Sequence, residues 1–486
     1  MPDISLIEKT GDWFANSAKS RGADYADLRI VRITTEGLRF VNAAPDLIDR
    51  KTTYGFGVRV LAKGAWGFAA RPGLMQADVE AAFNDALAIA KASSLLMKGK
   101  VKLESLPAVQ AAYSTPFSKD PFEVPLNEKV ELLKQLCGAM SAFDGINHAE
   151  AFLDFRREEK WFFSTEGARI IQTIQHSGAG INAAAQRSRR EVGERSYPTS
   201  GGQHVAGGYE AIEAMGLLDA CPVVAREAVE LLDAPPLPEM TTNLILSGDL
   251  VSLQIHESIG HPLELDRVFG SERNFSGTSF ATPDQLDKLK YGSDIVTVMA
   301  DPTAPDGLGS FGYDDEGVEA YPAPLIQNGV LVNYLSSRET AARISKKSTA
   351  AMRAETWGDL PLVRMTNTNL QPGSGTLDEL IADTDEGVLI ATPASWSIDD
   401  RRENFQLGGE VAWEIKGGKR GQMFNSAVYS GNTVTFWNSC NAICGPSEYR
   451  IWGTPNCGKG QPGQNMRTGQ GAAPARFIGV KVGQSA

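Results

Sequence analysis

Hydrophobic positions in the first half of the chain switch between helical and strand-like spacing. Helical periodicity predicts helices over residues 4–18, 79–96, 127–143 and 209–232. Alternating or β-rich runs punctuated by glycine predict strands over residues 27–34, 38–43, 51–61 and 65–70, and several more within 148–185. The charged, glycine-containing stretch 187–208 interrupts this pattern and predicts a loop.

The second half is dominated by short strand-like runs. A strand is predicted over residues 243–247, a helix over 250–260, and a hairpin over 317–335 with Asn328-Gly329 at its tip. Short helices are predicted at residues 377–383 and 433–444, and a glycine-rich loop at 453–471. The acidic string Asp314-Asp315-Glu316 predicts a solvated turn. Arg59, in the first half, is predicted to have a structural role.

A proline-rich segment separates the two halves. Residues 233–238 hold Pro235, Pro236 and Pro238, which cannot continue a helix and suit an extended linker. We therefore predict an α+β protein of two domains joined by this linker. Residues 1–232 would form a mixed α/β domain with antiparallel strands and helices, and residues 239–486 a β-rich domain carrying the helix at 250–260.

Charge and composition narrow the class of protein. The net charge of −12 argues against nucleic-acid binding, which needs a basic face. No apolar run reaches the roughly 20 residues that span a bilayer, and charged residues interrupt the first 24 positions, unlike a secretory signal. Five cysteines in 486 residues do not suggest a disulfide framework. The sequence therefore predicts a cytoplasmic protein.

The string Ile255-His-Glu-Ser-Ile-Gly-His261 carries the strongest chemical signal. The chain has only five histidines, and two of them fall here, with Glu257 directly after the first. Two imidazoles with a neighbouring carboxylate are what zinc-dependent hydrolysis needs, since the carboxylate takes the proton of the attacking water. We therefore predict that His256 and His261 bind zinc and that Glu257 is the general base.

The spacing of the two histidines requires an irregular helix. Residues four apart on an α-helix lie about 40° apart around its axis, whereas residues five apart lie about 140° apart. Two solutions bring His256 and His261 together. The helix ends at Gly260 and His261 lies on the following turn, or a π-bulge absorbs one residue.

A third ligand must come from outside this string. Glu264 and Asp266 are close in sequence, and Cys440, Cys444 and Cys457 offer thiolates. Cys440 and Cys444 lie among apolar residues and suit a buried structural role better. Cys457 lies in a polar, glycine-rich stretch without a packing reason for a thiol, so we favour it.

Several motifs resemble the TldD/PmbA family of metallopeptidases, in its TldD-like, metal-binding branch. The motifs are the segment 256–266, Asp314-Asp-Glu-Gly-Val318 with Gln327-Asn-Gly-Val330, Arg364-Met-Thr-Asn367, Asn456-Cys-Gly-Lys459, and more loosely Gly55-Phe-Gly-Val-Arg59 with Gly64-Ala-Trp-Gly67. The resemblance implies one zinc per chain on His256, His261 and Cys457, with Glu257 as the catalytic acid and base. It also implies hydrolysis of short or unfolded peptides by a dimer, formed with a metal-less PmbA-like relative or with a second copy.

Two other functions stay open from the residues alone. A regulatory scaffold would use the metal only for structure and would show a fourth protein ligand, such as Asp266 or a second cysteine. A zinc amidohydrolase acting on a small molecule would show a small closed pocket. A peptidase would instead hold an extended peptide at a strand edge, for which residues 310–317 and 406–413 are candidates.

Overall fold

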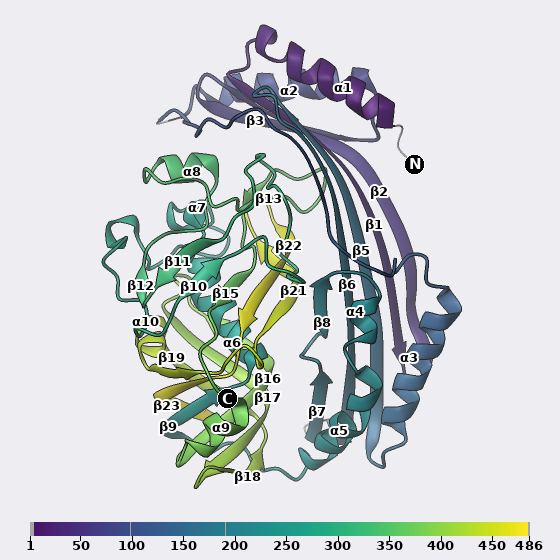
Figure 1. The fold of residues 1–486 in the computed structure, drawn as a ribbon, viewed down its shortest axis with the longest axis vertical. Helices are drawn as coiled ribbons and strands as arrows, with labels where there is room; N and C mark the ends of the chain where they lie inside the picture. The colour runs from purple at the N-terminus through teal and green to yellow at the C-terminus, as the bar shows by residue number, and fades with distance from the viewer. Residues whose placement is uncertain (1–3, 98, 190, 485–486) are drawn as a thin grey trace.

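The first half of the molecule is built on one sheet of long strands. The computed structural model describes residues 4–97, 99–189 and 191–484. The strands of this sheet are β1 (Tyr25–Val41), β2 (Ala44–Ala62), β3 (Ala65–Pro72), β4 (Gln110–Ser114), β5 (Ile146–Ser164), β6 (Arg169–Ser188), β7 (Glu191–Tyr197) and β8 (Gln203–Ala206). Their order is β3-β2-β1-β5-β6-β4, and β7 and β8 also pair with β6. Figure 1 shows β1, β2, β5 and β6 arching around the second half of the chain.

Helices cover both ends of this sheet. They are α1 (Ile4–Ser17), α2 (Gln76–Ser93), α3 (Leu126–Ser141), α4 (Glu210–Glu213) and α5 (Leu217–Glu230). Phe14 of α1 and Phe83 of α2 share a core with β1 and β2, while α3 and α5 share a second core with β5 and β6 (Figure 1). Alternate residues of β5 face that second core, from Ala149 to Phe155. This alternation is the strand periodicity that the sequence displays.

The second half is organised around strands that close into a ring. The strands are β9 (Met240–Leu246), β16 (Glu386–Ile398), β17 (Asn404–Lys416), β19 (Ala427–Asn432) and β23 (Ala475–Gln484). Pairing runs β16-β9-β23-β19-β17 and returns from β17 to β16. β18 (Lys419–Phe424) and β20 (Cys440–Ile443) extend the ring on the outside. The largest apolar core of the described residues packs against this ring.

Shorter elements connect the ring to the long sheet. The strands are β10 (Val298–Ala300), β11 (Ala323–Gln327), β12 (Val330–Leu331), β13 (Met352–Arg353), β14 (Leu362–Val363), β15 (Thr368–Leu370), β21 (Arg450–Lys459) and β22 (Gln464–Ala472). The helices are α6 (Gly248–Ile255), α7 (Leu265–Val268), α8 (Arg338–Ala342), α9 (Leu377–Ala382) and α10 (Thr433–Asn438). Asn328 and Gly329 both have positive φ between β11 and β12, as the predicted hairpin tip requires.

The predicted α+β class is confirmed, but several predicted loops and edges are wrong. The stretch 187–208 contains the end of β6 and strands β7 and β8 rather than a loop. The predicted helix 433–444 ends at Asn438, because Cys440–Ile443 pairs with β23 instead. Residues 406–413 belong to β17, which pairs with other strands of the closed ring on both sides. Residues 310–317 belong to no strand. Neither segment is therefore a free strand edge. The division into domains 1–232 and 239–486 stays a prediction.

The predicted solvated turn is also wrong, because Asp314, Asp315 and Glu316 are each only 2% exposed. They lie where the second half meets the long sheet. Asp315 pairs with Lys160 of β5 at 2.6 Å, and Glu316 pairs with Arg59 of β2 at 3.4 Å. Arg59 therefore has the structural role predicted for it.

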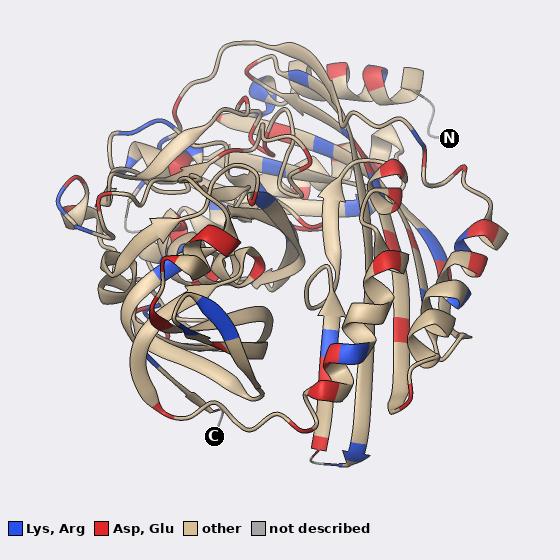
Figure 2. Cartoon of the chain, turned by 60° about the horizontal axis from the view of Figure 1, so that its bottom comes forward, with Lys and Arg blue, Asp and Glu red and all other residues tan. Residues whose placement is uncertain are grey.

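Figure 2 shows acidic and basic residues interspersed along the helices and strands of the chain. No helix in the described part of the chain is both long and apolar enough to cross a bilayer.

Candidate metal centre

His256 and His261 are brought together by a π-helical turn. Helix α6 ends at Ile255 and continues as a π-turn, His256–Gly260, followed by a 3₁₀ turn, His261–Leu263. The wider turn absorbs the additional residue, so the imidazole rings lie 4.9 Å apart between centroids. Of the two solutions that the spacing allows, the structure has the π-bulge.

Gly260 allows this turn to pack closely. A Cβ atom at residue 260 would lie 1.9 Å from the sulfur of Met365, which is fully buried. The turn is also fixed by Ser258, whose carbonyl accepts a hydrogen bond from Tyr291 and whose hydroxyl accepts one from Trp437 at 2.9 Å. The π-turn is therefore held by its surroundings as well as by its own backbone.

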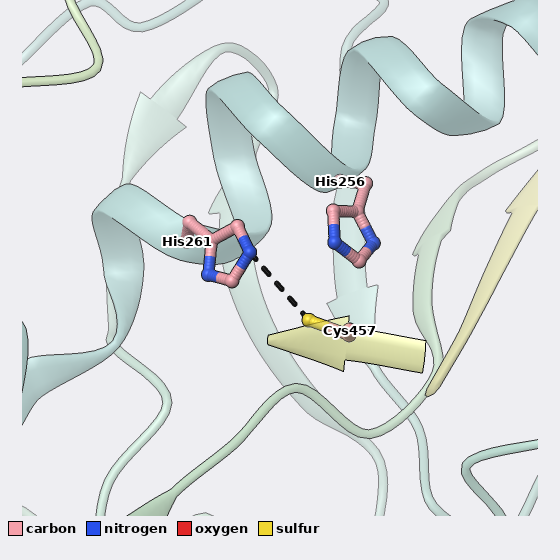
Figure 3. A group of neighbouring side chains, drawn as sticks. All are labelled: His256, His261 and Cys457. Carbon is pink, nitrogen blue, oxygen red and sulfur yellow. Dashed lines mark hydrogen bonds between the residues drawn. The ribbon is translucent and has the colours of Figure 1, made fainter. Parts of the chain in front are cut away.

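Cys457 reaches the two histidines from a strand that is distant in sequence. It lies on β21, and Figure 3 shows its sulfur directed towards both rings. The possible ligand atoms of His256, His261 and Cys457 lie within 4.8 Å of one another, and all three residues are buried. The structure thus brings the three predicted ligands together.

The distances within this group suit a tetrahedral zinc ion. Bonds of about 2.3 Å to sulfur and about 2.0 Å to nitrogen, at a tetrahedral angle, separate those two atoms by about 3.5 Å. The sulfur of Cys457 lies 3.5 Å from Nε2 of His261 (Figure 3). Nδ1 of His256 is buried without a hydrogen-bond partner among the described residues. The donor set and its spacing therefore fit the metal.

The other candidate ligands lie elsewhere. Glu264 accepts a hydrogen bond from Nδ1 of His261 at 2.9 Å, so it orients the ring and directs Nε2 towards Cys457. Asp266 pairs with the buried Lys459 at 2.7 Å. Cys440 and Cys444 belong to the apolar core.

The predicted glycine-rich loop that carries Cys457 is in fact the hairpin of β21 and β22. Its glycines serve close approach instead of flexibility. A Cβ at Gly453 would lie 2.0 Å from the carbonyl oxygen of His204, and a Cβ at Gly471 would lie 1.8 Å from the hydroxyl of Tyr449.

Electrostatics favour a thiolate at residue 457. Burial raises the pKa of the Cys457 thiol, but the nearby charges of His256, His261 and Arg364 outweigh burial and hold that pKa well below its usual value. For His261, burial lowers the pKa, but Cys457 and Glu264 outweigh it and raise the pKa to about 9. A metal cation suits the same position, because it would replace the protons of the thiol and the imidazole and supply positive charge in their place.

Glu257 lies beside the three ligands and is held by a residue that sequence reasoning missed. Its carboxylate forms an ion pair with Arg402, and its side chain is 8% exposed. Burial raises the pKa of Glu257, but His261, His256 and Arg402 outweigh it and lower that pKa. Arg402 has a positive φ of 63° in the connection between β16 and β17. It is 145 residues from Glu257, and no local pattern marks it.

The centre opens into a cavity of about 720 Å³. Its walls come from both halves of the chain. They are residues 199–202, Asp249, Ser252, Leu253, His256, Glu257, His261, Pro393, 396–398, Arg402 and 452–458.

Comparisons with curated proteins find relatives over nearly the full length of the chain. The metalloprotease MJ0996 of Methanocaldococcus jannaschii is 30% identical over 462 residues, covering 94% of this chain and 96% of that protein. A metalloprotease of Methanothermobacter thermautotrophicus is 29% identical and covers 95% of each chain. A zinc metalloprotease TldD homolog of Saccharolobus solfataricus is 20% identical, covering 97% of this chain and 99% of that protein.

Solved structures show the same fold. TldE from Thermococcus kodakarensis superposes with a TM-score of 0.72 at 15% identity, covering 97% of this chain and 99% of that one. Family models match residues 26–90 as PmbA/TldA metallopeptidase domain 1, 119–234 as its central domain and 239–483 as its C-terminal domain. The chain therefore belongs to the TldD/PmbA family of metallopeptidases.

Proposed function

We propose that this chain is a zinc metallopeptidase that hydrolyses peptide bonds in short or unfolded peptides. The observation that carries the proposal is the position of Glu257, which adjoins the His256, His261 and Cys457 group in one cavity. A metal used only for structure needs no carboxylate beside its ligands. Among the described residues, no other His, Cys, Asp or Glu joins the three ligands, which leaves a coordination position for water.

The residues around the centre have distinct tasks in this mechanism. A zinc ion held by His256, His261 and Cys457 would polarise the scissile carbonyl of the substrate and lower the pKa of the attacking water towards about 7. Glu257, which is ion-paired with Arg402, would take the proton of the water and deliver it to the departing amine. Glu264 fixes the ring of His261 through Nδ1.

The cavity suits an extended peptide better than a small molecule. Only residues 388–390 of β16 pair with β9, so the later part of β16 pairs with β17 alone and leaves one edge open. Pro393, Trp396, Ser397 and Ile398 of that part line the cavity. A peptide strand added at this edge would be held by backbone hydrogen bonds. This edge replaces the two edges predicted from the sequence.

The assembly and its location belong to the same proposal. We propose a dimer with a metal-less relative or with a second copy, on the sequence resemblance described above. A cytoplasmic location is supported by the five cysteines, all of which are free and buried.

The test compares the wild-type chain with Glu257→Gln and His256→Ala. Zinc content is measured by mass spectrometry, and hydrolysis of an unstructured peptide is followed by chromatography. Each protein is assayed alone and with a TldE-like relative. We expect one zinc per chain in wild type and Glu257→Gln, cleavage in wild type only, and loss of zinc in His256→Ala. Cleavage by Glu257→Gln at the wild-type rate would refute the assigned base, and absence of zinc from wild type under replete conditions would refute the metal centre.

A further inference from the structure

A second, smaller cavity of about 170 Å³ lies between the long sheet and the second half of the chain. Strands β5 and β6 contribute Arg156, Lys160 and His176 to its wall, and Arg353 of β13 and Arg467 of β22 face them. Pro455 of β21 lines both this cavity and the one at the metal centre. The two cavities therefore adjoin the same strand, β21, which carries Cys457.

Polar groups in this cavity lack partners among the described residues. His176 is 4% exposed, yet neither of its ring nitrogens has a hydrogen-bond partner. Nη1 of Arg467 is likewise buried and unpartnered, while its Nη2 pairs with Asp154 at 2.7 Å. Arg353 uses Nη1 for the carbonyls of Met365 and Arg467, and within the described part of the chain it has no ion pair with a carboxylate. Buried donors without acceptors cost free energy. An acceptor from a bound ligand would therefore satisfy donors that the described residues leave unpaired.

Four carboxylates line the same cavity, and each already has donors of its own, so they do not supply the missing acceptor. Asp314 accepts hydrogen bonds from the backbone N–H groups of Glu316 and Val318. Glu355 accepts one from the backbone N–H of Asn465 at 2.6 Å. Glu158 binds Arg156 at 2.7 Å and Lys160 at 3.0 Å. Asp315 binds Lys160 and accepts a hydrogen bond from the backbone N–H of Ala354 at 2.8 Å. The surplus donors are therefore on the side of His176, Arg353 and Arg467.

The surroundings on that side are positive, which the pKa values of its side chains reflect. Burial, together with the charge of Arg364, lowers the pKa of Arg353 to about 10. Burial and the charges of Arg467 and Arg156 hold the pKa of His176 well below its usual value. An anion between these groups would be attracted by the charges of Arg353 and Arg467 and could accept a hydrogen bond from the neutral ring of His176.

We propose that this cavity binds a small oxyanion of the class of inorganic phosphate or sulfate, held by His176, Arg353 and Arg467. The volume is below the roughly 300 Å³ at which pockets for drug-sized ligands begin, so a free ion with a few waters fits and a peptide does not. Planar guanidinium groups bind such oxygens with charge-assisted hydrogen bonds.

The site would connect the metal centre to the long sheet. Met466, adjacent to Arg467 on β22, is the register partner of Cys457 on β21. His176 belongs to β6 of the long sheet. An anion bound to both Arg467 and His176 would therefore hold the Cys457 hairpin against that sheet and stabilise the folded chain by mass action.

The test titrates the purified full-length chain with sodium sulfate and, separately, with sodium phosphate, at constant ionic strength set with sodium chloride. Binding is measured by calorimetry and by the thermal midpoint. We expect one saturable site per chain and a rise of the midpoint for both oxyanions. Arg353→Gln and His176→Gln, two independent variants in case one fails to fold, should each weaken binding about tenfold or more. Arg157→Gln is the matched control, since Arg157 lies on β5 but pairs with Asp120 outside the cavity.

Three results would overturn the proposal. The first is a wild-type midpoint that depends only on ionic strength. The second is unchanged affinity in both folded cavity variants. The third is binding that disappears in His256→Ala but persists in Arg353→Gln, which would place the anion at the metal centre instead. None of these readouts depends on peptidase activity. The anion site can therefore be refuted while the proposed peptidase function is retained, and the peptidase function can be refuted while the anion site is retained.

Discussion

At the scale of single residues, Glu264 is a buried carboxylate that orients His261 in the candidate metal centre. It is fully buried and accepts the Nδ1–H of His261. We predict that Glu264→Gln weakens zinc binding about 10- to 100-fold, because the ring loses its charged acceptor and becomes a poorer ligand. Competition with a chromophoric chelator measures the affinity directly.

Asp266→Asn is the matched control for this prediction. Lys459 pairs with both carboxylates, at 3.3 Å for Glu264 and 2.7 Å for Asp266, so either variant removes one negative charge beside that lysine. Of these two carboxylates, only Glu264 forms a hydrogen bond with His261. Asp266→Asn should therefore retain near wild-type zinc affinity. An equal loss in the two variants would show that charge at Lys459, and not orientation of His261, sets the affinity.

The residues of the centre differ in how far sequence could predict them. His256, Glu257 and His261 share one short string, and Cys457 lacked a packing reason for a thiol, so the pattern alone led to the group that the structure brings together. Arg402 acts on Glu257 across 145 residues. Such a contact depends on how the β16–β17 connection folds back over α6, which no local spacing records.

At the scale of elements, the π-turn is the feature on which the centre depends, and Gly260 is its most constrained position. We predict that Gly260→Ala destabilises the protein by about 1–3 kcal/mol, because the added methyl group overlaps the sulfur of Met365. The same shift should lower zinc affinity by moving His261. Urea unfolding and chelator competition check the two effects.

The double variant Gly260→Ala/Met365→Ala tests that cause. Met365→Ala alone should cost about 2–5 kcal/mol as a large-to-small change in a fully buried position. Because the smaller side chain makes room for the new methyl group, the two costs should sum to more than the cost of the double variant. Strict additivity would mean that the backbone of the π-turn, and not Met365, excludes a side chain at residue 260.

Helices and turns can be predicted from the sequence where the local pattern and the tertiary contacts favour the same structure. The helices at residues 4–18 and 377–383 and the hairpin tip at Asn328-Gly329 lie where the sequence predicts them. The β21–β22 hairpin was mistaken for a loop because its glycines suggest turns. These glycines allow close approach to Tyr449, directly before β21, and to His204, which is distant in sequence. The contact with His204 is information that no local pattern contains.

At the scale of the whole molecule, the two halves are joined by buried ion pairs that the sequence did not reveal. Three consecutive acids are typical of a solvated turn, but here the long sheet supplies Lys160 for Asp315 and Arg59 for Glu316. Asp314 instead accepts hydrogen bonds from backbone N–H groups of its own turn. Arg59 binds Asp27 at 2.7 Å as well as Glu316, and its side chain is 3% exposed. The joint is therefore a network in which each charge depends on the others.

We predict that Arg59→Met destabilises the chain by about 3–5 kcal/mol, because it leaves Asp27 and Glu316 buried without their shared cation. Methionine keeps much of the apolar volume, so packing changes least. Arg39→Met is the matched control: Arg39 pairs with Asp46 on the surface, where both side chains are more than 40% exposed, and its loss should cost about 0–1 kcal/mol. Urea unfolding of the three proteins measures both values. Similar costs for the two variants would mean that water reaches the joint and that its ion pairs do not hold the halves together.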